Sequence, residues 1–365
     1  MKIAAASITP FRVRLVRPLS TARGRIGSRD GFVLTVESDS GERGMGEASP
    51  AYWLGGEQIG ETRRALESIV QSVDRHRGPD QLRRLIEENS CGGSPLTPAA
   101  TCALDTALLD LSARLRGVPM ASLLGIECES IGPVPVCALL AGQTPEEVTR
   151  QARIAVGQGH TSFKLKVGAS PIAVDANKVA SLRMAIGSDF SIRLDANRAW
   201  TLDQAEVALH AFQPYGIEFL EEPLRSPQPG DMRRLRDATG VALALDESLS
   251  GAAALSAFIE HDGADYLVLK AARLGGPTRC VEIARLAATA GIKVVVTDSI
   301  ESAVGMSTAV HLASALSRHG TAVGAGGARF FPAGSFCGVE FPSVSQVLPD
   351  GPGLNVSAYP PRKGN

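Results

Sequence analysis

From residue 134 onward the chain alternates short apolar stretches with amphipathic helical stretches. Eight apolar stretches begin 24 to 29 residues apart, which is the length of one strand followed by one helix. Eight such units are typical of a parallel (β/α)8 barrel, the modified TIM barrel, whereas open doubly wound sheets more often have five or six strands and a glycine-rich loop. The turn LLAGQTPEE after the first stretch lacks that loop. The expected strands span residues 134–139, 162–167, 191–195, 218–221, 242–246, 266–270, 293–297 and 321–324.

The remaining parts of the 365-residue chain predict a cap on this barrel. The first part combines strand-like alternation, a hairpin with turn chemistry at Asp39-Ser40-Gly41, and an Ala/Leu-rich helix over Pro98–Arg116. We therefore expect an α+β capping domain over residues 1–130 and the barrel over residues 131–328. Residues 329–365, rich in Pro and Gly, are expected to return to the cap. Loops at 20–30 and 49–57 are expected to form a lid.

Composition excludes several classes of protein. Lys plus Arg is 37 and Asp plus Glu is 38, a net charge of −1 that argues against nucleic acid as a partner. No apolar run approaches a membrane span, and the N-terminus lacks the apolar core of a signal peptide. The six cysteines are far apart and form no Cys-x-x-Cys pair, which favours a reducing compartment. A cytoplasmic enzyme is the expectation.

Acidic side chains stand at the ends of three successive expected strands. They are Asp195, Glu221 and Asp246. In such barrels chemistry collects at the C-terminal ends of the strands, and neighbouring strands lie about 4.8 Å apart. Three carboxylates with room for water and substrate oxygens suit Mg²⁺, with Mn²⁺ as a substitute. The alternative is that each acid caps the following helix, but that explanation is weak for three equivalent positions.

Lysines bracket the three acids. Lys164 and Lys166 lie two residues apart on the second strand and share a face, and Lys270 ends the sixth strand. A like charge and a nearby dication lower the pKa of an ammonium, so that a lysine here could act as a base. The alternative, a solvated surface charge, fits one isolated lysine better than two positions facing each other across three acids.

This set of residues resembles the enolase superfamily in its muconate lactonizing enzyme subgroup. The resemblance covers nearly the whole chain, because GERGMGEASP and LDTALLDLSARLRGVPMASLLG are similar to that family's capping domain. It implies abstraction of the proton α to a carboxylate, with Mg²⁺ stabilising the enediolate. It also implies a homo-oligomer acting on a small-molecule carboxylate. The lysine on strand six separates this subgroup from the mandelate racemase type.

The resemblance assigns a role to each charged residue. Lys166 is the expected base, and Lys164 keeps it deprotonated. Lys270 is either a second base, which gives racemisation, or a cation that holds the intermediate. Glu221 rather than Glu222 is the expected metal ligand beside Asp195 and Asp246, because it stands two positions before a proline, and because strand alternation turns its neighbour away.

The resemblance leaves several reactions open. The dipeptide epimerases of the subgroup carry acids on strand eight, where this chain has Gly324, Ala325 and Gly326. The strand-seven segment TDSIESAVGMS is similar to that of o-succinylbenzoate synthases, although Asp298 departs from their usual Ser. The leading hypothesis is therefore dehydration to o-succinylbenzoate. The alternative is a racemase, epimerase or cycloisomerase, such as an N-succinylamino acid racemase or a muconate cycloisomerase.

Substrate contacts are expected from the strand ends and the lid. The candidates on the strands are Asn197, Ser299, Glu301 and Ser302. Tyr52 and Trp53 could pack on an apolar substrate, or could simply pack between the domains. A non-catalytic binding protein on the same fold is the alternative from another class, and the complete set of acids and lysines argues against it.

Overall fold

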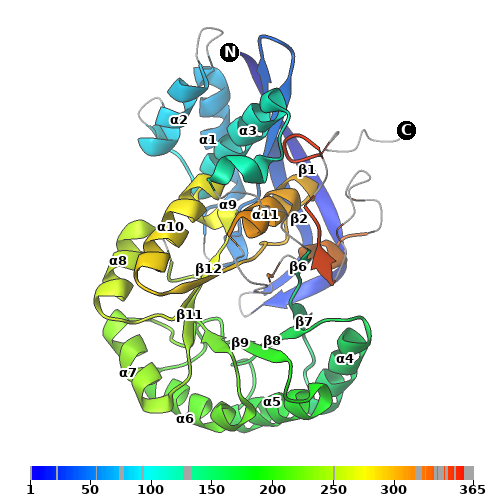
Figure 1. Cartoon of the computed structure of the whole chain (residues 1–365), viewed down its shortest axis with the longest axis vertical. Coiled ribbons are helices and arrows are strands. Elements are labelled where there is room, and N and C mark those ends of the chain that lie inside the picture. Colours follow the sequence, from blue (N-terminus) through cyan, green and yellow to red (C-terminus); the bar gives the residue numbers. More distant parts are fainter. Residues whose placement is uncertain are drawn as a thin grey trace.

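The computed structural model describes most of the chain as an N-terminal cap above a barrel (Figure 1). The described residues are 2–21, 24–54, 56–73, 78–91, 94–125, 133–249, 251–316, 323–324, 326–332, 335, 341, 344–348 and 351–356. Most of the expected C-terminal segment, part of the strand expected at 321–324, and the end of the expected cap at 126–130 lie outside them.

The sheet of the cap is an antiparallel meander in the order β1-β2-β3. Its strands are β1 (Ile3–Thr21), β2 (Gly24–Ser38) and β3 (Arg43–Ala48). The predicted turn at Asp39-Ser40-Gly41 is confirmed: Gly41 adopts a φ of 84° there and its N–H donates to Ser38 O. The sheet brings β3 against the helix α3 (Pro98–Arg116) of the cap.

The loop predicted over residues 20–30 is wrong. Residues from Gly24 onward belong to β2, and the β1–β2 ladder pairs Thr21 with Gly24 at its end. The run of Gly, Ser and Arg looked like a loop because it lacks apolar alternation. A long hairpin forms instead, since Ile26 packs with Leu15 and Phe331 in a small apolar cluster.

Helices pack on the sheet of the cap. The predicted helix at Pro98–Arg116 is confirmed as α3. Thr97 caps its first turn by accepting the N–H of Ala100, and Gly117 ends it with a φ of 67°. The other elements of the cap are η1 (Tyr52–Leu54), α1 (Ile59–Ser72), α2 (Pro79–Glu87), β4 (Ser90–Cys91), β5 (Ser94–Pro95) and η2 (Met120–Leu124).

Seven parallel strands of the barrel form one sheet in the order β13-β12-β11-β10-β9-β8-β7. Hydrogen bonds from the eighth unit close it, because Val323 bridges Val136 and Gly324 bridges Thr297. The predicted (β/α)8 period is thereby confirmed. The seven strands are β7 (Ala138–Leu140), β8 (Ser162–Lys166), β9 (Ser191–Asp195), β10 (Phe219–Glu221), β11 (Leu243–Leu245), β12 (Tyr266–Leu269) and β13 (Lys293–Val296). The short strand β6 (Val134–Pro135) pairs instead with residues 345–346 of the tail.

Helices surround these strands on the outside (Figure 1). Those between the strands are α4 (Pro145–Gly157), α5 (Ile172–Ile186), α6 (Leu202–Phe212), η3 (Gln213–Tyr215), α7 (Pro229–Thr239), α8 (Ala252–Glu260), α9 (Ala271–Leu274) and α10 (Pro277–Thr289). The last elements are α11 (Ala303–Leu316), η4 (Gly327–Phe330) and β14 (Ser345–Gln346).

The chain after the barrel contacts the cap again. Asp110 of α3 accepts N–H groups from both Met45 of β3 and Leu354 of the tail, at 2.9 and 2.7 Å. Pro119 pairs with Gly353 as well. Leu354 is fully buried, so the tail forms part of the contact between α3 and the barrel.

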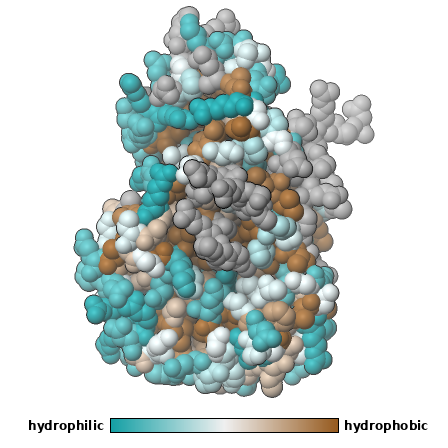
Figure 2. All heavy atoms as spheres, in the orientation of Figure 1, coloured by the Kyte–Doolittle hydropathy of each residue, from teal (hydrophilic) through white to brown (hydrophobic). Residues whose placement is uncertain are grey.

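The surface carries both polar and apolar side chains. Figure 2 shows hydrophilic residues along the rims of the cap and of the barrel, with smaller hydrophobic areas between them. Among the described helices, none has the length and apolar composition needed to cross a bilayer.

Candidate active site

Three buried carboxylates stand side by side at the C-terminal ends of β9, β10 and β11. Asp195 ends β9 and is the Cα partner of Glu221, which ends β10. Asp246 directly follows β11. All three are at most 4% exposed. The strand register therefore brings the acids expected from the sequence onto three neighbouring strands.

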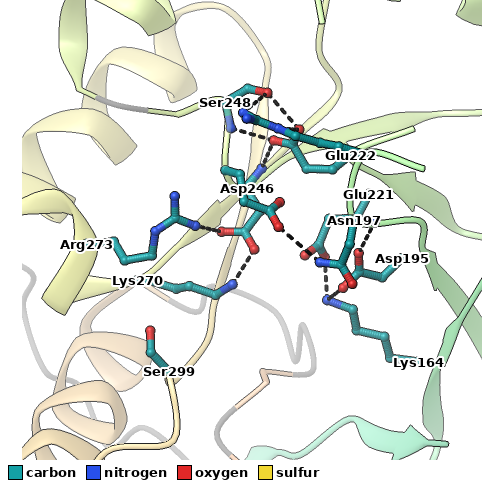
Figure 3. Close-up of polar contacts among 12 residues, drawn as sticks. Lys164, Asp195, Asn197, Glu221, Glu222, Asp246, Ser248, Lys270, Arg273 and Ser299 are labelled. Atoms are coloured by element: carbon teal, nitrogen blue, oxygen red, sulfur yellow. Dashed lines mark hydrogen bonds and ion pairs between the residues drawn. The ribbon is translucent and has the colours of Figure 1, made fainter. Parts of the chain in front are cut away.

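The predicted lysines contact these carboxylates from two sides (Figure 3). The ammonium of Lys164 lies 2.9 Å from Asp195 Oδ2 and 2.6 Å from Glu221 Oε2. Lys166 Nζ lies 2.8 Å from Asp195 Oδ2. On the other side, Lys270 Nζ pairs with Asp246 Oδ2. The three acidic strands thus separate the lysines of β8 from the lysine that follows β12.

The buried ionic groups of the site shift one another's pKa values. Burial opposes the charge of the Lys164 ammonium, but Asp195 and Glu221 outweigh it and raise the Lys164 pKa. Burial likewise opposes charge on Asp195, and the two lysines of β8 hold its pKa below the usual range. Burial and the charge of Asp195 raise the pKa of Glu221 to about 8. The two carboxylates beside Lys164 therefore favour its charged form.

The donor set fits a hard divalent cation, although the acids do not surround one point. No three Asp, Glu, His or Cys side chains in the described ranges are gathered closely enough to hold an ion, and Lys164 lies between Asp195 and Glu221. The free donor is Glu221 Oε1, which is buried without a hydrogen-bond partner among the described groups. Carboxylate oxygens are the ligands that Mg²⁺ prefers.

Residues around the acids fix their backbone. Glu222 turns away from Glu221, as expected, and its carboxylate accepts the N–H groups of Asp246 and Ser248 at 2.8 and 2.6 Å. Its φ of 44° makes this reversal possible. Arg273 also contacts this group, at 3.0 Å from Asp246 Oδ1. The sequence did not predict the roles of Glu222, Ser248 and Arg273. The doubled acid in FLEEPL was the signal for Glu222.

Asn197 joins the acids to the exposed side of the site. Its Oδ1 accepts a hydrogen bond from Lys166 Nζ, and its Nδ2 donates to Glu247 Oε1 at 3.0 Å. Asn197 and the adjacent Arg198 both have a positive φ, 44° and 63°. The predicted substrate role of Asn197 stays a prediction, and its observed side-chain contacts are with Lys166 and Glu247.

The strand-seven candidates point in different directions. Ser299 Oγ is buried and has no hydrogen-bond partner among the described groups, and the side chain lies on the Lys270 side of the site (Figure 3). Glu301 Oε2 accepts the N–H of Ser299 at 2.6 Å. Ser302 donates to Glu47 of the cap. Of these three predicted contacts, Ser299 alone presents an unpaired hydroxyl.

Tyr52 and Trp53 lie in η1 of the cap and are half-buried. Their rings meet edge to face, with centroids 5.1 Å apart. The guanidinium of Arg29 lies 4.5 Å from the centroid of the Trp53 ring, and Trp53 also packs against the cluster that contains Phe331. This contact corresponds to the alternative of packing between the domains.

Sequence families match both parts of the chain. Residues 4–125 match the mandelate racemase / muconate lactonizing enzyme N-terminal domain, and residues 147–359 match the enolase C-terminal domain-like family. A capped parallel barrel with acids on three strand ends and lysines on either side is the architecture of the enolase superfamily. The chain belongs to that superfamily, in the muconate lactonizing enzyme subgroup.

Three similar proteins have different activities. A hydrophobic dipeptide epimerase from Enterococcus faecalis is 28% identical over 86% of this chain and 88% of its own. Muconate cycloisomerase 1 from Acinetobacter baylyi is 27% identical, covering 81% of this chain and 80% of its own. An N-succinyl-L-Arg/Lys racemase from Bacillus cereus is 26% identical over 86% and 84%.

A solved structure supports the same assignment. The dipeptide epimerase from E. faecalis V583, complexed with Mg and the dipeptide L-Leu-L-Tyr, has a TM-score of 0.82 and 27% identity, and it covers 91% of this chain and 92% of its own. These relatives are epimerases, a racemase and a cycloisomerase, so they favour the isomerase alternative over the dehydration hypothesis.

Proposed function

We propose that this protein racemises or epimerises a small carboxylate by moving the proton on the carbon next to the carboxyl group. The observation that carries the proposal is the placement of Lys166 and Lys270. Three acidic strands lie between the strands of these lysines, and each ammonium contacts the acid nearest to it. A carbon bound between them has one base on each face, which inversion requires and a one-base elimination does not.

We assign a separate role in this reaction to each charged residue of the site. Lys166 removes the proton from one face, and Lys270 returns one to the other face. Lys164, partly buried between two carboxylates, supplies a fixed positive charge beside the substrate carboxylate. Asp195, Glu221 and Asp246 would hold Mg²⁺. Mg²⁺ held there would supply charge stabilisation for the enediolate left when the weakly acidic proton is removed.

The substrate we propose is an N-acylated α-amino acid. An acid that could hold a free ammonium is missing from strand eight, where the sequence has Gly324, Ala325 and Gly326. The next element instead offers Arg329, whose guanidinium donates to Leu139 O at 3.1 Å. Leu139 is the Cα partner of Lys164. This cation therefore suits an acyl carbonyl or a second carboxylate, as does the N-succinyl group named for the B. cereus relative.

Proton exchange in D₂O tests the proposal. Each enantiomer of N-succinyl amino acids is incubated with Mg²⁺ and the wild-type protein, and NMR follows loss of the α-proton and optical inversion. We expect exchange from both enantiomers. Lys166→Ala should lower the rate of exchange from one enantiomer about 10²- to 10⁴-fold. Lys270→Ala should lower the rate of exchange from the other enantiomer by a similar factor.

Lys293→Ala is the matched control, because Lys293 begins β13 at the opposite end of the barrel. It should keep wild-type rates. Exchange from a single enantiomer, or undiminished inversion in Lys166→Ala, would overturn the two-base assignment. Loss of water from a cyclohexadiene carboxylate with no inversion of any amino acid derivative would restore the dehydration hypothesis.

A further inference from the structure

The turn that follows strand seven is strained at Ile300. Its φ is 61°, in the left-handed region, where a β-branched side chain is an outlier. Such a conformation persists only where surrounding contacts over-determine it, and it costs about 1 to 3 kcal/mol. The turn also carries Ser299, the strand-seven candidate with an unpaired hydroxyl.

Contacts within the turn account for part of this restraint. The N–H of Ile300 donates to Asp298 Oδ1 at 2.7 Å, and the N–H of Ser299 donates to Glu301 Oε2 at 2.6 Å. Asp298 is held in place in turn, because its Oδ2 accepts the N–H of Gly327 at 2.9 Å. These bonds fix the two amides but leave the carbonyl of Ile300 to another partner.

That partner is Arg29 of the cap. Its Nε donates to Ile300 O at 2.9 Å, while its terminal nitrogens donate to Pro50 O and Ser49 O, both at 2.7 Å. Arg29 is fully buried, and the Trp53 ring lies over its guanidinium. One planar group therefore joins two carbonyls of the cap to the strained residue of the barrel.

Glu47, on the neighbouring strand β3, holds the other end of the turn. Its carboxylate accepts the N–H groups of Ser302 and Gly305, each at 2.9 Å, as well as the Ser302 hydroxyl. Ser49 Oγ donates to it at 2.5 Å. The cap thus grips the turn at Ile300 and again at the start of α11, and we call Arg29 and Glu47 the latch.

We propose that the latch consists of positioning residues, which keep Ile300 in its strained conformation so that the Ser299 hydroxyl contacts the bound substrate. The inference rests on the proposed function for the role of Ser299, but the restraint itself does not. Ser299 Oγ is buried with no partner among the described groups, and its side chain lies on the same side of the site as Lys270 (Figure 3). A buried hydroxyl without a partner is costly unless a ligand supplies one.

Hydrogen exchange of the protein without metal or substrate tests the restraint. In Arg29→Met the backbone amides of residues 299–302 should exchange at least about tenfold faster. Loss of one hydrogen bond from a charged group should raise the population of the locally open turn by that factor. Arg12→Met is the matched control, since Arg12 lies on the same sheet and pairs with Asp30 on the surface. It should leave these amides unchanged. Unchanged protection in Arg29→Met would overturn the latch.

Kinetics on the racemisation substrate test the link to Ser299. Ser299→Ala and Arg29→Met should each raise KM about tenfold and lower kcat less. Together they should cost little more than either change alone, because both remove the same contact. Arg29→Lys should recover part of the loss. Additive effects of the two changes would refute the positioning role.

Relief of the strain gives a second readout. Glycine adopts a positive φ without cost, so Arg29→Met should raise KM by a smaller factor in an Ile300→Gly background than in the wild type. An equal factor in both backgrounds would contradict the role of strain. If Arg29→Met does not fold, Glu47→Gln replaces it in the exchange experiment with the same expected result at Ser302. Wild-type inactivity towards every carboxylate would refute the proposed function and leave the exchange result to decide the latch.

Discussion

The cap depends on close contact between β3 and α3, and Gly46→Ala tests that contact. A Cβ at Gly46 would overlap the carbonyl oxygen of Ala103, and it would lie 2.7 Å from the Ala103 carbonyl carbon and 2.9 Å from Ala107 N. Carbon atoms in ordinary contact lie about 3.5 to 4.0 Å apart. The strand and the helix must therefore separate by about 1 Å to admit one methyl group.

The loss in free energy of unfolding has two sources, the packing between β3 and α3 and the hydrogen bond that joins them. Overpacking by a methyl group costs about 1 to 3 kcal/mol. The displacement also lengthens the 2.9 Å hydrogen bond from Met45 N–H to the buried carboxylate of Asp110, and loss of a bond to a charged group costs about 1.5 to 3 kcal/mol more. We expect Gly46→Ala to lower the free energy of unfolding by about 3 kcal/mol or more.

Thermal unfolding followed by circular dichroism measures the effect. At about 1.3 °C per kcal/mol for a chain of this size, Tm should fall by about 4 °C. Gly27→Ala is the control, because Gly27 lies in the same sheet and a Cβ there meets no atom within 4 Å. It should unfold within about 1 °C of the wild type. A Gly46→Ala protein as stable as Gly27→Ala would show that β3 and α3 are not packed at this distance.

Three further changes have defined outcomes. Burial raises the pKa of Asp105 to about 6, above its value of about 4 in the unfolded chain, so the wild type loses stability as pH rises from 4 to 6. Asp105→Asn should therefore gain roughly 2 kcal/mol relative to the wild type between those pH values in urea titrations, and a constant difference would refute this. Glu222→Gln should weaken Mg²⁺ binding about tenfold in calorimetry, because Glu222 fixes the backbone of Asp246; unchanged affinity would contradict that role. Asp110→Ala should free the tail at Leu354 and speed its proteolysis, whereas an equally resistant tail would show that Asp110 does not anchor it.

The parts of this molecule that the sequence predicted are those set by local periodicity. Strand spacing gave the barrel, because each unit repeats the same pairing of strand and helix. It also placed Asp195, Glu221 and Asp246 at the ends of neighbouring strands, since parallel strands in register carry their last residues to one edge of the sheet. Lys164 and Lys166 followed from alternation by two along one strand.

The parts that the sequence did not predict depend on contacts between distant segments. Arg29 and Glu47 form hydrogen bonds to residues 300–305, which lie more than 250 positions away in the sequence. No local sequence pattern predicts a contact of this kind. The extension of β2 through Gly24 is of the same kind, because Phe331 from the far end of the chain helps to bury Ile26. In both cases a contact with a segment distant in sequence determines the local structure, and the secondary-structure propensity of the residues does not.

These two origins divide the site into halves with different consequences. The half made of acids and lysines is positioned by strand register, so its placement depends on the barrel and not on the cap. The half that holds Ser299 depends on Arg29 and Glu47, which the cap must present at the right depth. Relatives 26 to 28% identical to this chain are named for dipeptides, muconate and N-succinyl amino acids. We therefore expect changes confined to the cap to alter the substrate while the proposed proton transfer between Lys166 and Lys270 is retained.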